Sequence, residues 1–192
     1  MALPDTTEVY ICVDVETAGP IPGPGPGPGG YSLLSIGACT IFEPQYTFYI
    51  ELKPINENIT EESASVHKLS LERLMEDGVA PVEAMKRFED WLKDQVAPEQ
   101  QPVFVAFNAA FDWMFINSYF YHYLGYNPFG HAPLDIKAFY MGWAGVPWAQ
   151  TSWRFVGPRF VEERHLTHHA LQDALDQAEL FQKMLGEMHK HT

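Results

Sequence analysis

Four carboxylates and one histidine are the residues of this sequence best suited to chemistry. They are Asp14 and Glu16, then Asp112, and finally His168 with Asp173. Each acid lies beside an apolar stretch, where burying an unpaired carboxylate would cost considerable free energy. A divalent cation is the simplest group that would make such a cluster stable. Carboxylates that hold Mg²⁺ or Mn²⁺ beside a free histidine base can cleave phosphodiester bonds.

The positions of the acids within their predicted elements favour a shared site. Asp14 and Glu16 are two residues apart at the end of a predicted strand, so both side chains point to the same face. A solvent-exposed edge strand would carry the same pattern without a cation. Asp112 and Asp173 fall in early helical turns, where a lone acid commonly interacts with the helix dipole. The set as a whole, rather than any single acid, therefore indicates a metal site.

The predicted elements explain how these residues would meet. Three strands joined by short connections favour an antiparallel meander and span residues 8–15, 33–42 and 46–52. A fourth strand follows at 102–107, and 134–143 is expected to hold a strand end and a short helix. Apolar residues at helical spacing predict helices over 60–77, 81–96, 109–124 and 169–188. A polar loop is expected before the last of these helices. This order predicts an α/β fold with a mixed five-stranded sheet flanked by helices.

Length and composition predict one globular domain over residues 1–192, because 192 residues with 46% hydrophobic content can bury a sizeable core. Alternating proline and glycine at 19–30 form neither a helix nor a central strand, so this segment is expected to be a loop insertion. The net charge of -13 argues against gripping a long duplex through many phosphates. It leaves two readings open: an acidic protein unrelated to nucleic acid, or an enzyme that holds only a strand end.

The cysteines and the apolar runs bear on location. Cys12 and Cys39 lie in strand-like runs without the spacing of a metal site, which favours small buried thiols. The N-terminal residues lack the pattern of a signal peptide, and no apolar run is long enough to span a bilayer. The sequence therefore predicts a cytoplasmic protein that does not enter a membrane.

Three motifs in order resemble those of the DEDDh 3′–5′ exonuclease family. They are D-x-E-T from Asp14, N-x-x-F-D ending at Asp112, and H-x-A-x-x-D from His168 to Asp173. VHKLS at 66–70 also resembles the family segment V-H-G-[IL]-[ST], which borders the pocket for the terminal nucleotide. The resemblance extends from Tyr10 to Leu180 and implies an RNase H-like fold.

The resemblance also implies a mechanism. Two divalent ions, Mg²⁺ or Mn²⁺, would be bound by the four acids; one would activate the attacking water and the other would stabilise the leaving 3′ oxygen. His168 would take the proton from that water, since imidazoles titrate near neutral pH. His165 and His169 are close in sequence, but only His168 has the register of the motif with Ala170 and Asp173.

Residues around the motifs are expected to hold the substrate, and the resemblance implies this set: Thr17, Ala18, Val66, His67, Leu69, Phe107, Asn108 and Trp113. Phe111 is expected to pack in the core instead. Phe107 stands where many members have histidine, and Lys68 stands where they have glycine. The Pro-Gly loop begins directly after D-x-E-T, so it would cover the substrate, contact a partner, or be a tolerated surface insertion.

The predicted activity is metal-dependent hydrolysis at single-stranded RNA or DNA 3′ ends, with release of nucleoside 5′-monophosphates. RNA and DNA both remain open, because few pocket atoms read the 2′-hydroxyl group. The family's frequent homodimers imply a second copy as a partner. Two alternatives are a catalytically idle domain of the same fold that binds nucleic acid or protein, and a phosphodiesterase for very short oligonucleotides.

Overall fold

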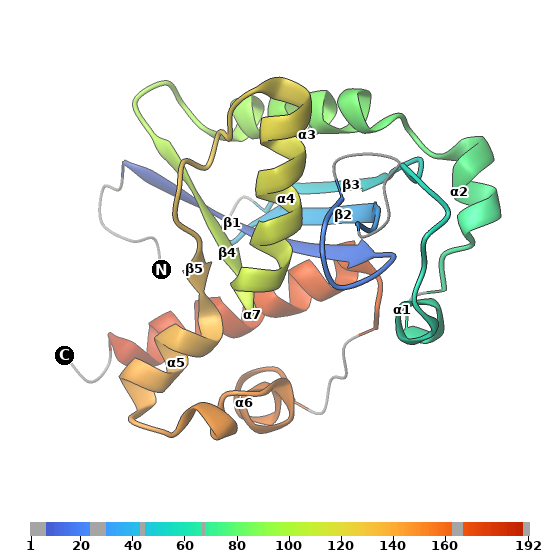
Figure 1. Ribbon diagram of the computed structural model, residues 1–192. Helices are drawn as coiled ribbons and strands as arrows, with labels where there is room; N and C mark the ends of the chain where they lie inside the picture. The colour runs from blue at the N-terminus through green and yellow to red at the C-terminus, as the bar shows by residue number, and fades with distance from the viewer. Residues whose placement is uncertain (1–6, 24–29, 43–44, 67, 163–166, 190–192) are drawn as a thin grey trace.

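A five-stranded sheet with the strand order β3-β2-β1-β4-β5 forms the centre of the molecule (Figure 1). The computed structural model describes residues 7–23, 30–42, 45–66, 68–162 and 167–189. The strands are β1 (Glu8–Thr17), β2 (Leu33–Thr40), β3 (Thr47–Glu51), β4 (Gln101–Ala106) and β5 (Leu134–Asp135). The first three pair antiparallel, whereas β4 pairs parallel with β1 and with β5. The predicted mixed sheet with its antiparallel meander is confirmed.

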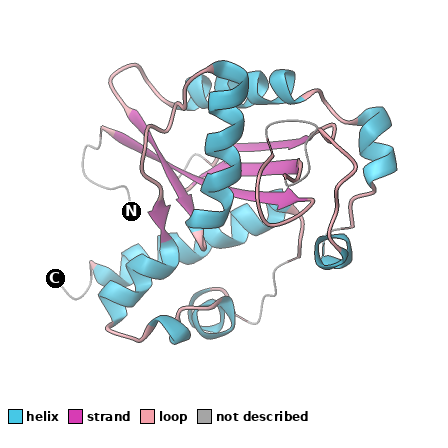
Figure 2. Ribbon diagram, in the orientation of Figure 1, coloured by secondary structure: helices cyan, strands magenta, loops and turns pink. Residues whose placement is uncertain are grey.

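Helices cover both faces of the sheet (Figure 2). They are α1 (Glu61–Val66), α2 (Leu71–Asp77), α3 (Pro81–Gln95), α4 (Ala109–Leu124), α5 (Ile136–Ala144), α6 (Trp153–Phe160) and α7 (Ala170–Met188), with the 3₁₀ turn η1 (Trp148–Gln150) before α6. One apolar core lies between the sheet and α3 and α4, where Phe88, Phe104 and Phe120 are fully buried. A second core joins the other face to α5, α6 and α7. None of the described helices is both long and apolar enough to cross a membrane.

The central strands β1 and β2 show why the sequence folds in this way. All eight residues of β2 are buried, which matches its near-continuous apolar run. In β1, Ile11 and Val13 face the first core, whereas Cys12 faces the second, as the two-residue period of a strand requires. Cys12 and Cys39 are free, buried thiols.

Gly37 lets α7 lie directly on the sheet. It pairs with Asp14 across β1 and β2. A Cβ atom at this position would lie 2.1 Å from the backbone carbonyl carbon of Ala170. The absence of a side chain therefore allows the first turn of α7 to approach the strand that carries Asp14.

The helical segments differ from the sequence prediction in two places. The helix expected over 60–77 is two helices, because the Ser70 side chain accepts a hydrogen bond from the Arg73 N–H (3.3 Å) and starts α2. Helix α6 lies within the expected polar loop. Its Gly157 and Pro158 are residues that normally interrupt helices, and they hide it from a reading of the sequence.

The described ends of the Pro-Gly loop are hydrogen-bonded to each other. The Tyr31 N–H donates to the Ile21 carbonyl (2.9 Å), and the Gly23 N–H donates to the Tyr31 carbonyl (3.3 Å). A Cβ atom on Gly30 would lie 1.9 Å from the Cα atom of Gly23, so glycine is required for this close approach. These bonds hold the beginning of the insertion against the segment that leads into β2.

Candidate active site

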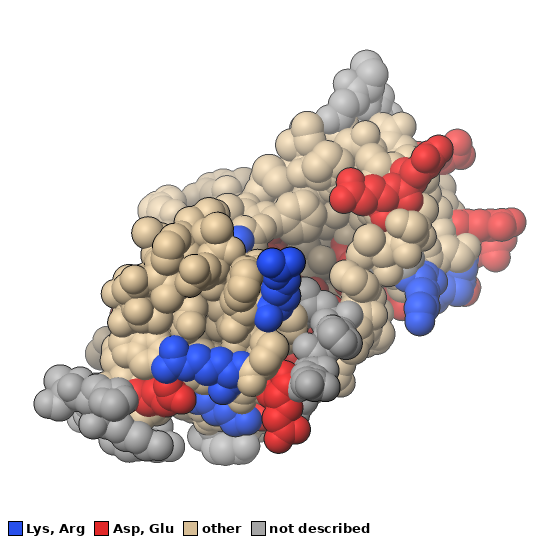
Figure 3. All heavy atoms as spheres, turned by 90° about the horizontal axis from the view of Figure 1, so that it is seen from below, with Lys and Arg blue, Asp and Glu red and all other residues tan. Residues whose placement is uncertain are grey.

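A cavity of about 390 Å³ opens at the carboxyl end of β1. Its size falls within the range of small-molecule sites. Figure 3 shows the hollow between the part of the molecule that carries α5 and α6 and the part that carries α1, with acidic side chains at its base. The described residues that line it are Asp14, Val15, Glu16, Thr17, Gly19, Pro20, Thr60, Glu62, Ser63, Val66, Phe107, Asn108, Phe111, Asp112, His168 and Asp173.

The four acids reach this cavity from three elements. Asp14 and Glu16 are at alternate positions of β1, while Asp112 and Asp173 lie in the first turns of α4 and α7. The Asp112 Oδ1 atom accepts a hydrogen bond from the Val15 N–H (3.1 Å), which fixes the start of α4 to β1. Glu16, Asp112 and Asp173 are all buried. The structure thus brings together acids that are separated by up to 159 positions, from 14 to 173, in the sequence.

Burial and the charges of neighbouring carboxylates raise the pKa values of Asp14, Glu16 and Asp112, so these three groups are reluctant to ionise. Burial raises the pKa of Asp14 well above its usual range, and the charges of Asp112 and Glu16 raise it further. Burial also raises the pKa of Asp112, although the hydrogen bond from the Val15 N–H opposes this. Burial and the charge of Asp173 raise the pKa of Glu16 to about 7. A bound divalent cation would reverse these shifts, so the electrostatics of the cluster fit a metal site.

The closest part of the cluster has the spacing of a metal site. One ligand atom each from Glu16, His168 and Asp173 lies within 4.8 Å of the other two. Carboxylate oxygens are the ligands that Mg²⁺ and Mn²⁺ prefer. His168 therefore lies close enough either to contribute a ligand or to act next to the ions as a base.

The backbone of His168 is held in an uncommon conformation by Asp173. His168 has a φ of 56°, in the left-handed region that costs free energy for residues other than glycine. The Asp173 Oδ2 atom accepts from the His168 N–H (2.9 Å), and its Oδ1 atom accepts from the N–H and hydroxyl of Thr167 (2.7 and 2.8 Å). One carboxylate therefore lines the cavity and also fixes the turn that presents the histidine.

His169 has a different environment from His168. Its ring stacks on the ring of Tyr49, with centroids 4.7 Å apart, and it is not among the described residues that line the cavity. This placement agrees with the choice of His168 made from the motif register, whereas His165 lies outside the described residues.

Comparison with known proteins decides the family. No protein-family model matches the chain. A 3′–5′ DNA exonuclease, Cap18 of Escherichia coli, is 48% identical over 174 residues, which are 91% of this chain and 90% of the relative. The nuclease domain of 3′hExo, a DEDDh family member whose structure was solved with rAMP, superposes with a TM-score of 0.77 at 16% identity over 97% of this chain and 95% of that one. The chain belongs to the DEDDh family of 3′–5′ exonucleases.

A further solved structure shares the fold of this exonuclease. Escherichia coli Exonuclease I, in complex with a dA16 oligonucleotide, superposes with a TM-score of 0.69 at 13% identity, over 96% of this chain and 42% of that one. The RNase H-like fold is therefore confirmed. The family depends on divalent metal ions, and Glu16, His168 and Asp173 of this chain form a group that could hold one.

The expected substrate-binding residues of this DEDDh exonuclease divide into two groups. Thr17, Val66, Phe107 and Asn108 line the cavity. Phe111, which was expected in the core, lines the cavity and also lies against the Phe115 ring, with centroids 5.5 Å apart. His67 lies outside the described residues.

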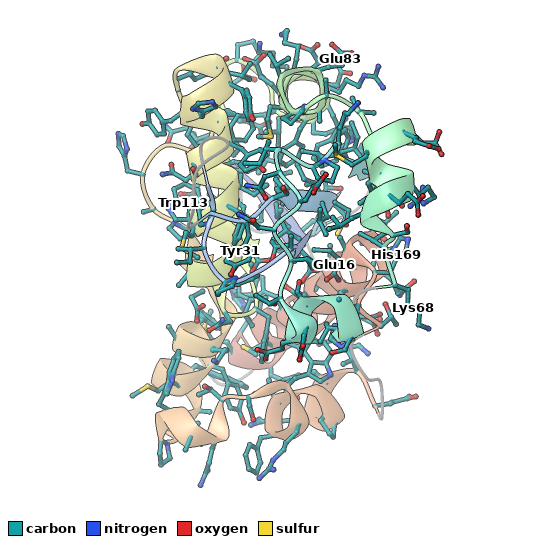
Figure 4. The ribbon with its side chains drawn as sticks, turned by 45° about the vertical axis from the view of Figure 1, so that its right-hand side comes forward. Glu16, Tyr31, Lys68, Glu83, Trp113 and His169 are labelled. Carbon is teal, nitrogen blue, oxygen red and sulfur yellow. The ribbon has the colours of Figure 1, made fainter. Side chains whose placement is uncertain are left out.

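The other three lie away from the cavity, as far as the described residues show. Ala18 is fully buried in a small apolar cluster with Leu34 and Leu74. Leu69 packs against that cluster. Trp113 stands edge-on to Phe104 (5.2 Å) and is well separated from Glu16 (Figure 4). Each helical residue turns by about 100°, so the neighbour of Asp112 presents its ring to the core instead of the cavity.

One wall of the cavity was not predicted from the sequence. Thr60, Glu62 and Ser63, together with Gly19 and Pro20 of the Pro-Gly loop, line it. The Ser63 hydroxyl donates to the carbonyl of Thr17, and the Thr60 N–H donates to that of Ala18 (2.9 Å). These bonds tie α1 to the end of β1. The only sequence signal was the position of these residues just before the family-like segment at 66–70.

Proposed function

We propose that this exonuclease removes nucleotides from the 3′ end of single-stranded DNA and releases nucleoside 5′-monophosphates. The observation that carries the proposal is the group formed by Glu16, His168 and Asp173, whose ligand atoms lie within 4.8 Å of one another. Asp14 and Asp112 line the same cavity. The preference for DNA is supported by the relative at 48% identity, which is named a DNA exonuclease.

Each residue proposed to act in the cavity would have one of three roles: metal binding, proton transfer or contact with the terminal base. Asp14, Glu16, Asp112 and Asp173 would hold two divalent ions, Mg²⁺ or Mn²⁺, which when bound supply positive charge for the attacking and leaving oxygens. His168, exposed at the cavity, would accept the proton of the attacking water. Phe107 and Phe111 would give a flat apolar surface for the terminal base. The placement of these residues around one cavity supports the proposed roles.

The two alternatives are less well supported. A binding domain without activity has no need of four acids and a histidine in one cavity. A phosphodiesterase for very short oligonucleotides would use the same residues and is separated by its substrate lengths. The homodimer and the cytoplasmic location remain predictions from the sequence.

The test is digestion of DNA and RNA oligomers of the same sequence, carrying a 5′ label, with Mg²⁺ or Mn²⁺. We expect stepwise shortening from the 3′ end, faster on DNA, with mononucleotide products and no activity in chelator. His168→Ala should lower kcat by about 10²–10⁴-fold, as expected for loss of a general base. His169→Ala is the matched control, because its ring lies on Tyr49.

Three results would contradict this proposal. Wild-type turnover by His168→Ala would exclude the assigned base. Faster digestion of RNA would exclude the preference for DNA. Cleavage confined to dinucleotides would favour the short-substrate phosphodiesterase.

A further inference from the structure

We propose that the DNA strand leaving the cavity lies on a surface formed by α5, η1 and α6. This surface, which we call the α5–α6 track, consists of Lys137, Trp148, Arg154 and Phe155. The inference rests on the proposed function, because it concerns the part of the same strand that lies upstream of the 3′ end. It assigns residues outside the cavity to the binding of a single-stranded polymer.

The size and charge of the cavity require such a path and favour one direction. A cavity of about 390 Å³ holds the end of a strand, so the remaining nucleotides must leave it. On the α1 side the strand would meet Glu61 and Glu62, which repel phosphates. In Figure 3 both signs of charge are present on both sides, but acidic side chains predominate on the α1 side and a basic group lies directly at the rim of the hollow on the α5–α6 side. Charge therefore favours an exit over α5 and α6.

The cations of the track differ from most others in the described part of the chain. Carboxylate partners are found for Arg73, Lys86, Arg87, Lys93, Arg159 and Lys183. Lys137 and Arg154 have no such partner among the described residues. The Lys137 Nζ atom lies 4.4 Å from the ring centroid of Trp148, and the Arg154 guanidinium lies 4.6 Å from that of Phe155. Lys53 and Lys68 also have no carboxylate partner among the described residues, but they lie on the α1–α2 side of the molecule.

The rings of the track are open to solvent. Trp148 is 51% exposed and Phe155 is 44% exposed. Cations next to exposed rings are what single-stranded nucleic acid requires, since phosphates bind the cations and bases stack on the rings. In a protein with a net charge of -13, two cations that have no carboxylate partner among the described residues are suited to bind a polyanion.

The track is continuous with the cavity through two contacts of the cavity wall. Asn108, a lining residue, accepts a hydrogen bond at Oδ1 from the Lys137 Nζ atom (3.2 Å). Phe107, also a lining residue, stands edge-on to Trp153 (5.3 Å), which directly precedes Arg154 in α6. A strand whose terminal base lies by Phe107 thus meets α6 as soon as it leaves the cavity.

The experiment compares a long single-stranded oligodeoxynucleotide with a dinucleotide for two double variants, Lys137→Ala with Arg154→Ala, and Trp148→Ala with Phe155→Ala. The matched control is Arg87→Ala on α3, which lies on the opposite side of the molecule from α6 (Figure 1). Binding of a 5′-fluorescein oligonucleotide, followed by anisotropy, and kcat/KM are measured at several salt concentrations. Thermal melting checks that each variant is folded, and glutamine replaces alanine at positions 137 and 154 if it is not.

The expected results follow from phosphate and base contacts. Loss of two cations should reduce the slope of log affinity against log salt by about 1.4, because each single-strand phosphate contact contributes about 0.7. Loss of the rings should weaken binding of the long strand by about 5-fold or more. In both variants the effect on the long strand should exceed the effect on the dinucleotide, and Arg87→Ala should keep the wild-type slope.

Unchanged affinity and salt slope for the long strand in both double variants would overturn the track. They would show that this surface serves another partner, such as a protein. Failure of the proposed function is distinct, since the wild-type enzyme would then release no mononucleotides from DNA. The anisotropy measurement tests the track even in that case, because it depends on binding and not on cleavage.

Discussion

Replacing Gln177 with leucine should weaken metal binding although every proposed ligand stays in place. The Gln177 side chain is 2% exposed and lies one helical turn after Asp173. Its Nε2 atom donates to Asp14 Oδ1 (2.7 Å), and its Oε1 atom accepts from the Phe107 N–H (2.8 Å). A backbone N–H can only donate, so the amide oxygen must face Phe107 and the amide nitrogen must face Asp14. The network thus aims a fixed donor at the carboxylate.

The size of the effect follows from these two bonds. Leucine has a similar volume but cannot form either one. Leaving the Phe107 N–H unsatisfied in the interior costs about 1–3 kcal/mol of stability. Removing a group that orients a metal ligand typically lowers metal affinity about 10–100-fold. We therefore expect a lower melting temperature together with a weaker apparent affinity for Mn²⁺.

Calorimetric titration with Mn²⁺, beside thermal melting in chelator, measures both effects. Gln172→Leu is the matched control: the residue lies on the same helix, is exposed, and its amide donates to Asp176 (3.0 Å), and neither residue is among those that line the cavity. It should keep wild-type metal affinity. If Gln177→Leu melts earlier yet binds Mn²⁺ as tightly as the wild type, the amide supports only the fold and the reasoning about Asp14 is wrong.

Two further predictions concern stability. The folded-state pKa of Glu16 is about 7, above its usual value of 4.5, so the folded protein keeps a proton that the unfolded chain loses. The metal-free protein should therefore become less stable as pH rises from 4.5 through 7, and divalent ions should reduce this loss; melting curves that rise with pH in chelator would contradict it. Gly37→Ala should lower stability by about 1–3 kcal/mol in denaturant unfolding, because its Cβ would lie 2.1 Å from the Ala170 backbone. Gly186→Ala in α7 has open space and should be neutral or stabilising, and equal effects of the two would refute the proposed close approach.

Much of the fold was predictable because its signals are local. A run such as residues 9–13 needs no distant partner to indicate a buried strand, and the two-residue spacing of Asp14 and Glu16 fixes their common face. Asp112 and Asp173 were assigned to the site only as members of the whole set and through the family-like motifs, because a lone acid in an early helical turn commonly interacts with the helix dipole. The order of strands and helices then restricted the sheet to a few arrangements.

What the sequence did not reveal depends on contacts between distant segments. The wall made by α1 exists because the Ser63 hydroxyl binds the carbonyl of Thr17, and no local pattern of either residue indicates this. Ser70 split a predicted helix because its side chain competes for a backbone donor. Trp113 was expected at the substrate from the family resemblance, but its ring packs against Phe104, because neighbouring residues of a helix point in different directions.

The acidic net charge, which argued against the gripping of a long duplex, is consistent with this architecture. The enzyme concentrates carboxylates where divalent ions would neutralise them, at the point where the end of β1 meets the first turns of α4 and α7. Helix N-termini favour negative charge, so two of the four acids lie where the backbone already stabilises them. Few cations are needed for a substrate held mainly at its end, provided that they lie beside the exit from the cavity. A uniform negative surface would repel the strand, and Lys137 and Arg154 interrupt that surface on the α5–α6 side.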